Sequence, residues 1–63
     1  MQSYLKEILD SNGIKYGFIA KQVGISNAAM TNLIKGGLPT LPVAARIAKV
    51  LGKPIEEIWT VEE

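Results

Sequence analysis

The sequence predicts an all-α protein, a compact bundle of five short helices. Glycine and proline divide the chain into segments of about 8 to 12 residues, a length that suits short helices. Within these segments, apolar residues recur at positions i, i+3 and i+4, as they do on one face of a helix. No stretch alternates apolar and polar residues for long enough to indicate a strand. We expect one domain, residues 1–63, with an ordered core over about 3–60 and a short acidic C-terminal tail.

The first two helices are expected in the first third of the chain. One runs from about Ser3 to Ser11 and ends at the Asn12-Gly13 dipeptide. The second is short and presents Ile19 and Val23, four positions apart, on one face. Gly24 ends it, because glycine lacks the Cβ that hinders the left-handed conformation of a helix cap. The apolar stripe of the first helix consists of Leu5, Ile8 and Leu9.

A third helix is expected to begin at Ser26. The serine hydroxyl is a good cap, since it can accept a hydrogen bond from a free N–H group of the next turn. This helix buries Met30, Leu33 and Ile34, again at i, i+3 and i+4, and it stops at Gly36-Gly37.

Two further helices are expected in the last third of the chain. Thr40 caps the fourth, and Pro42 is tolerated in its first turn because no N–H group is needed there. Gly52 ends the fourth helix, and Pro54 opens a short fifth one. The inward-facing residues of the two helices are Val43, Ala44, Ile47, Ala48, Leu51, Ile55, Ile58 and Trp59.

Composition and charge limit the kinds of function that we expect. The sequence holds no Cys and no His, which excludes a disulfide framework and effectively excludes structural zinc. The net charge is only +1, but residues 11 to 55 contain no acid, and their local excess of positive charge can attract phosphates. The six cations of this stretch are Lys15, Lys21, Lys35, Arg46, Lys49 and Lys53.

Other classes of protein are not expected. The chain has no phosphate-cradling glycine loop and no pair of carboxylates in its central part, so we expect no enzyme and no cofactor or metal. It also has no run of 18 apolar residues and no leader segment, so we expect no membrane contact and a soluble, cytoplasmic protein.

The segment around Gly24 predicts two helices that cross steeply. Such a crossing needs close approach of the two backbones, which Ala20 permits, while Ile25 fills the wedge between the helices. The outward face of the third helix is then small and polar, and it begins at a helix N-terminus, so it can enter a major groove without a clash. That face consists of Asn27, Ala28, Thr31 and Asn32.

With these residues the chain resembles the lambda-repressor-like helix-turn-helix family, the Cro and XRE-type regulators, from about Leu5 to Ile58. The family motif of about twenty residues would run from Tyr16 to Lys35. Downstream, a glycine at Gly36 and the sequence "AKVLG" at 48–52 also match the family pattern. The apolar, small and glycine positions of the motif are filled by Ile19, Ala20, Val23, Gly24, Ile25, Met30 and Leu33.

The resemblance implies a sequence-specific regulator of transcription, a Cro-like and phage-like repressor that binds an inverted repeat of duplex DNA as a homodimer. It further implies that the recognition helix, about 26–35, contacts bases through its first residues and one residue a turn later. Asparagine pairs with adenine and a methyl group contacts thymine, whereas no Arg is present on this helix to bind guanine, so we expect A·T-containing half-sites. The implied base contacts are Asn27, Ala28, Thr31 and Asn32, and the alternative is that they form an ordinary solvated helix face.

Phosphate contacts are implied at five positions near this helix: Lys15, Tyr16, Ser26, Lys35 and Gly36. Tyr16 stands where the family commonly has Gln, and a phenol can still donate to phosphate. Lys15 stands where a Ser or Thr cap is usual, and a cation there opposes the helix dipole. Lys15 is therefore either a ligand for a negative group or simply a solvated lysine.

A second function stays open, in which the same fold binds a protein, as an antirepressor, an antitoxin-like protein or a regulatory subunit. Tyr16 and Phe18 replace polar residues of the family, and they either pack on the first helix or form, with Leu38, an apolar contact surface. Ile55 and Trp59 either cover the small core or form a dimer seam. Dimerisation would have to use the fifth helix and its tail, where the acids Glu62 and Glu63 do not help.

Overall fold

Five helices follow one another along residues 2–60, the part of the chain that the computed structural model describes. They are α1 (Leu5–Ser11), α2 (Tyr16–Val23), α3 (Asn27–Ile34), α4 (Leu41–Leu51) and α5 (Ile55–Ile58). The predicted all-α fold class is therefore confirmed. The single domain over 1–63 stays a prediction, and its acidic tail at Glu62 and Glu63 lies outside the described residues.

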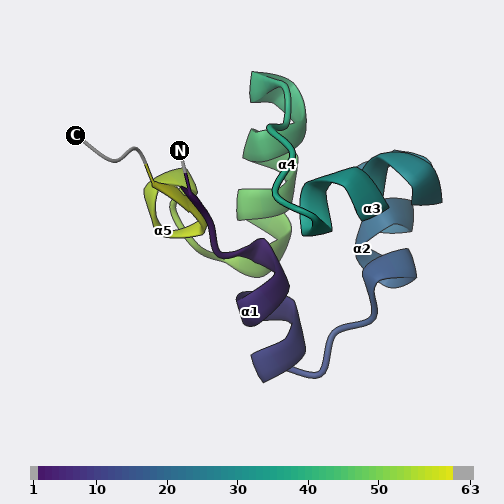
Figure 1. Ribbon diagram of the computed structural model, residues 1–63, viewed down its shortest axis with the longest axis horizontal. Coiled ribbons are helices and arrows are strands. Elements are labelled where there is room, and N and C mark those ends of the chain that lie inside the picture. Colours follow the sequence, from purple (N-terminus) through teal and green to yellow (C-terminus); the bar gives the residue numbers. More distant parts are fainter. Residues whose placement is uncertain (1, 61–63) are drawn as a thin grey trace.

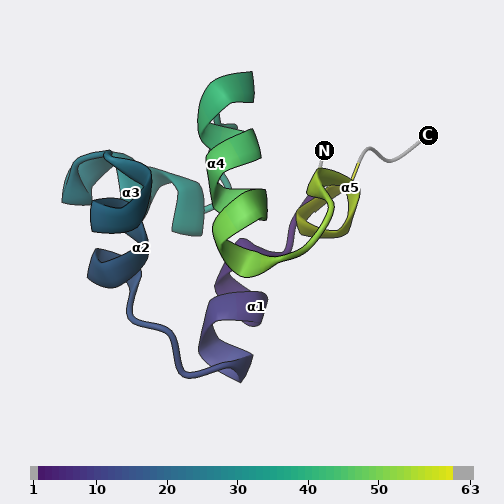
Figure 2. The same cartoon turned by 180° about the vertical axis from the view of Figure 1, so that it is seen from behind.

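Helix α4 occupies the middle of the molecule, and both views show α2 and α3 on one side of it and α5 on the other (Figures 1 and 2). Helix α2 packs against both α3 and α4, and α5 packs against α4. The chain reaches α2 through a connection after α1 that passes below the other helices in Figure 1. This arrangement leaves one side of the α2–α3 pair open to solvent.

All five helices contribute to one hydrophobic core. Of the predicted apolar stripes, Leu5, Leu9, Met30 and Leu33 are buried as expected. Burying each side chain of this size contributes about 1.5–3 kcal/mol to stability. Ile8, Ile34, Val43, Leu51 and Ile55 are only partly buried at its margin. The largest fully buried side chains are Leu5, Leu9, Ile19, Met30, Ile47 and Ile58.

A short antiparallel ladder joins the two ends of the described chain, where the sequence predicted no strand. Strand β1 (Gln2–Ser3) pairs with β2 (Trp59–Thr60), with Gln2 opposite Thr60 and Ser3 opposite Trp59. The pairing also corrects the start of the first helix, which is Leu5 and not Ser3. Ser3 is extended in the ladder, and the N–H of Tyr4 donates to the carbonyl of Ile58 at 2.7 Å.

The helix caps follow the predictions in part. The Ser26 hydroxyl accepts a hydrogen bond from the N–H of Ala29 at 3.1 Å, so the predicted cap of α3 is present. Thr40 occupies the N-cap position of α4, but its side chain makes no capping hydrogen bond. Pro42 lies in the first turn of α4, as predicted.

Candidate nucleic-acid interface

The turn between α2 and α3 fixes how the two helices cross. Gly24 adopts a left-handed conformation, with φ of 84°, and the N–H groups of Gly24 and Ile25 both donate to the carbonyl of Ala20, at 2.9 and 3.0 Å. Ala20 and Val23 are buried beneath this turn, and the half-buried Ile25 packs against the core. The small residue, the turn glycine and the apolar wedge therefore lie where a tight crossing needs them.

The candidate base-contacting residues lie on the face of α3 opposite its buried residues. Ala28, Thr31 and Asn32 are spaced at i, i+3 and i+4, so they share one face, and Asn27 lies one turn before Thr31. All four residues are exposed, whereas Met30 and Leu33 on the other face are buried. The sequence-predicted set is thus brought together on one open surface.

The Thr31 hydroxyl is already used within α3. Its Oγ1 donates to the backbone carbonyl of Asn27 at 2.9 Å. The hydroxyl therefore has no proton left for an outside acceptor, and Thr31 can offer a partner only its lone pairs and its methyl group. Asn27 and Asn32 make no side-chain hydrogen bond within the described part of the chain, so their amides are available.

Most candidate phosphate contacts lie at the two ends of α3 or before α2. Lys15 is the N-cap residue of α2, and Lys35 is the C-cap residue of α3 with the exposed Gly36 beside it. Ser26 uses an oxygen lone pair to cap α3, which leaves its own proton free to donate. These groups flank the uncharged face of α3 with two cations and one hydroxyl.

Tyr16 differs from the other phosphate candidates, because its hydroxyl donates to Asp10 Oδ1 at 2.6 Å. Lys6 Nζ lies 2.8 Å from the other oxygen of the same carboxylate. The hydrogen bonds from Lys6 and Tyr16 hold the pKa of Asp10 below its usual value, and the bond to Asp10 raises the pKa of Tyr16. Tyr16 can donate to a phosphate only if it leaves Asp10.

A match to a known protein family identifies this arrangement of helices. A model of the helix-turn-helix family matches residues 5–58, which span α1 to α5. The chain belongs to this helix-turn-helix family. The predicted Cro-type membership is confirmed, and it supports a DNA-binding regulator.

One curated helix-turn-helix relative bears a more specific name. Over 53 residues the chain is 38% identical to "Antitoxin HigA-1" of Vibrio cholerae serotype O1 (strain ATCC 39315 / El Tor Inaba N16961). The match covers 84% of this chain and 50% of the relative, so the chain spans about half the length of that protein.

The predicted protein-contact residues of this helix-turn-helix protein do not form one surface. Tyr16 borders a hollow of about 260 Å³ with Gly17, Asn27, Met30 and Thr31. Phe18, which is 56% exposed, borders another hollow with Gly13, Ile14 and Lys15. Leu38 borders a third, so these residues would contact a partner at separate places.

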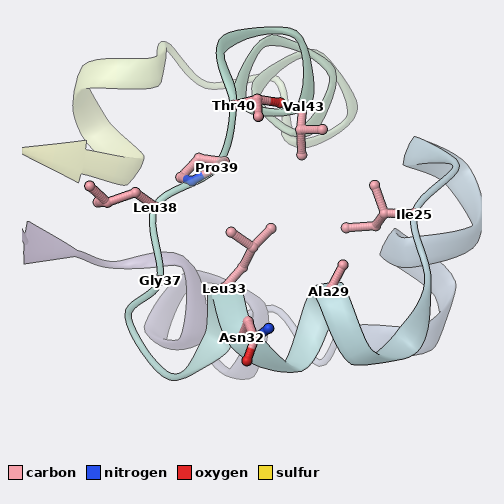
Figure 3. Close-up of a pocket in the computed structure, with 9 residues that line it drawn as sticks. All are labelled: Ile25, Ala29, Asn32, Leu33, Gly37, Leu38, Pro39, Thr40 and Val43. Atoms are coloured by element: carbon pink, nitrogen blue, oxygen red, sulfur yellow. The ribbon is translucent and has the colours of Figure 1, made fainter.

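This third hollow, of about 240 Å³, lies between α3 and the start of α4. Ala29 and Leu33 point from α3 toward Pro39 and Val43, and Ile25 points in from the turn (Figure 3). Leu38 is 66% exposed at its edge, and the neighbouring Leu41, which sequence reasoning missed, is 75% exposed. The hollow beside α3 therefore has an exposed apolar edge at Leu38.

The placement of Trp59 favours a role in the core over a dimer contact. Its side chain is only 5% exposed, and Ile55 is half-buried against the same core. The indole Nε1 of Trp59 is buried and has no hydrogen-bond partner within the described residues.

Residues 2–60 contain neither a membrane-spanning helix nor a cluster of metal-ligating side chains. No helix in this range is long and apolar enough to cross a membrane. No group of three or more His, Cys, Asp or Glu side chains there could hold a metal ion.

Proposed function

We propose that this chain regulates transcription by binding double-stranded DNA sequence-specifically, with α3 in the major groove. The observation that carries this proposal is the exposed, uncharged face of α3, set by the Gly24 turn in a member of the helix-turn-helix family. A narrow face of this kind can approach base edges closely, since it presents no long side chain to the groove.

The chemistry of this face supports recognition of A·T base pairs. The free amides of Asn27 and Asn32 can each donate to adenine N7 and accept from its N6, which contributes roughly 1–3 kcal/mol of discrimination per base. The methyl groups of Ala28 and Thr31 match the thymine methyl, and the inward hydrogen bond of the Thr31 hydroxyl favours this use.

Phosphate contacts from Lys15, Ser26, Lys35 and Gly36 would position α3 in the groove. Two cations per protomer give only weak binding to one half-site, and a net charge of +1 adds little attraction at long range. We therefore propose a homodimer on an inverted repeat, acting as a repressor in the cytoplasm. Contacts from two protomers then add on one DNA molecule.

Selection from a randomised duplex library at low and moderate salt tests this function. We expect enrichment of an A·T-containing inverted repeat. The double variant Asn27→Ala, Asn32→Ala should lose the enrichment and keep its circular dichroism spectrum. Gln2→Ala with Ser11→Ala, which changes two exposed polar residues outside α3, serves as the matched control. If no duplex were enriched, the proposed DNA-binding function would be wrong.

A second candidate function is binding to a protein partner, and two observations favour it. The relative from Vibrio cholerae is named an antitoxin, and apolar surface is exposed at Leu38, which borders the hollow beside α3, and at Leu41, where α4 begins. If no duplex is enriched, the test is whether the full chain retains a protein partner. Leu38→Ser with Leu41→Ser should then abolish retention, and Phe18→Ser tests the separate hollow near Lys15.

A further inference from the structure

Three polar residues connect the end of α1 to the start of α2. Lys6 and Asp10 lie one turn apart on α1 and form an ion pair at 2.8 Å. Asp10 then accepts the hydrogen bond from the Tyr16 hydroxyl at 2.6 Å, across the connection that contains Asn12-Gly13. The Asp10 carboxylate thus accepts hydrogen bonds from both side chains, and the bond from Tyr16 favours one orientation of the phenol ring.

The first turn of α2 in turn borders the reading residues of α3. Tyr16 and Gly17 form one wall of the hollow whose other wall includes Asn27 and Thr31. A Cβ placed on Gly17 would lie 4.0 Å from the Asn27 Oδ1, so the Asn27 amide stands directly over this turn. Because Tyr16 and Asn27 border the same hollow, a movement of the Tyr16 ring would change the shape of the space beside Asn27.

We propose that Asp10 and Tyr16 are positioning residues for DNA recognition: Asp10 fixes the Tyr16 ring, and the ring fixes the first turn of α2 beside Asn27 and Thr31. This inference rests on the proposed function. It assigns the Tyr16 hydroxyl to Asp10 and not to a phosphate, and it makes Asp10 a determinant of base discrimination although it lies on α1.

Four variants of the full chain test the proposal: Asp10→Ala, Asp10→Asn, Tyr16→Phe and the double variant Asp10→Ala, Tyr16→Phe. The probes are the duplex that the unaltered protein enriches and its single-base variants. Asp10→Ala and Tyr16→Phe should each weaken binding by about threefold to tenfold, the range of one hydrogen bond. Both should reduce discrimination at the base pairs that Asn27→Ala affects.

The double and the conservative variants give the decisive results. If the two residues act as one unit, the double variant binds no more weakly than either single variant. Asp10→Asn keeps an oxygen acceptor for Tyr16 and should bind within about twofold of the unaltered protein. All variants should show the same circular dichroism spectrum as the unaltered chain.

Several outcomes would overturn the proposal. Loss of affinity in Tyr16→Phe without loss in Asp10→Ala would mean that Tyr16 donates to a phosphate. A gain of affinity in both Asp10→Ala and Asp10→Asn would mean that Asp10 only repels DNA. Additive losses, or unchanged binding by all variants, would show that the pair does not position α3.

Backbone amide NMR spectra without DNA separate a failure of this proposal from a failure of the proposed function. Asp10→Ala and Tyr16→Phe should shift the same amide signals of Asn27 and Thr31. Asp10→Asn should leave those signals near their original positions. If no duplex is enriched but these shifts occur, DNA recognition fails while the positioning of α3 by Asp10 and Tyr16 stands. If the shifts are absent, the positioning itself is wrong.

Discussion

The N–H of Gly37 donates to the backbone carbonyl of Asn32 at 2.8 Å, and a Cβ at Gly37 would stand 2.7 Å from the same oxygen. Only glycine fits this approach without a shift of the backbone. Because the carbonyl belongs to a candidate base-contacting residue, Gly37 helps to hold the last turn of α3.

Gly37→Ala should therefore destabilise the protein by about 1–3 kcal/mol, the usual cost of forcing extra volume into a packed site. Gly17→Ala is the matched control, since its Cβ would meet nothing closer than 4.0 Å, and this variant should be at least as stable as the unaltered chain. Urea unfolding measures both changes. Equal midpoints for Gly37→Ala and the unaltered chain would contradict the close approach.

Removing the Ser26 hydroxyl should cost about 1 kcal/mol of stability, because the N–H of Ala29 loses its capping partner. Thr40→Ala provides the comparison at the same helix position of α4, where no side-chain cap is made, and it should change stability much less. The free energies of unfolding of Ser26→Ala and Thr40→Ala test whether Ser26 alone caps its helix through the side chain. A larger loss for Thr40→Ala would reverse the assignment.

The salt dependence of DNA binding should report the contacts of Lys15 and Lys35. The slope of log K against log salt is negative, and each phosphate that a protomer neutralises makes it steeper by about 0.9. Lys15→Gln and Lys35→Gln should each make the slope shallower by about this amount per protomer. Lys53→Gln removes the same charge from the connection between α4 and α5 and should leave the slope nearly unchanged. Equal slopes for all three variants would place the phosphates elsewhere.

Lowering the pH should remove a small part of the protein's stability, because Asp10 becomes protonated. Hydrogen bonds from Lys6 and from Tyr16 lower the pKa of this carboxyl below its ordinary value of 3.8. The contribution is therefore fully present above that ordinary pKa, and it is lost as the pH falls through the lower pKa of the folded state. Both partners of the ion pair are exposed, so the effect is small.

Asp10→Asn cannot titrate, and this makes it the reference for the acid effect. The stability of the unaltered protein relative to this variant should be constant near pH 6 and should decline below about pH 4. Urea midpoints at a series of pH values measure the difference. A difference that grows toward acid would have the wrong sign for a lowered pKa.

Much of the fold was predictable because helix signals are local. The spacing of Leu5 and Leu9, the hydroxyl of Ser26 and the glycines at 24 and 52 each fix a helix through its own neighbours in sequence. The face of α3 followed from the same spacing. Its chemistry as a DNA contact remains a prediction.

Contacts between distant parts of the chain were not predictable in this way. A strand of two residues has no alternating pattern, so the pairing of Ser3 with Trp59 leaves no periodic signal in the sequence. The hydrogen bond from Tyr16 to Asp10 was missed for a related reason. The ion pair of Lys6 with Asp10 at i, i+4 is visible in the sequence, but the path of the chain between the helices is not.

The ladder of β1 and β2 makes the described chain nearly a ring, since Gln2 lies opposite Thr60 and β2 contacts α5. A short peptide could join these two positions, and new ends could be opened between α4 and α5 at Lys53 without cutting a helix. Such a circular permutant would keep α3 in its present surroundings.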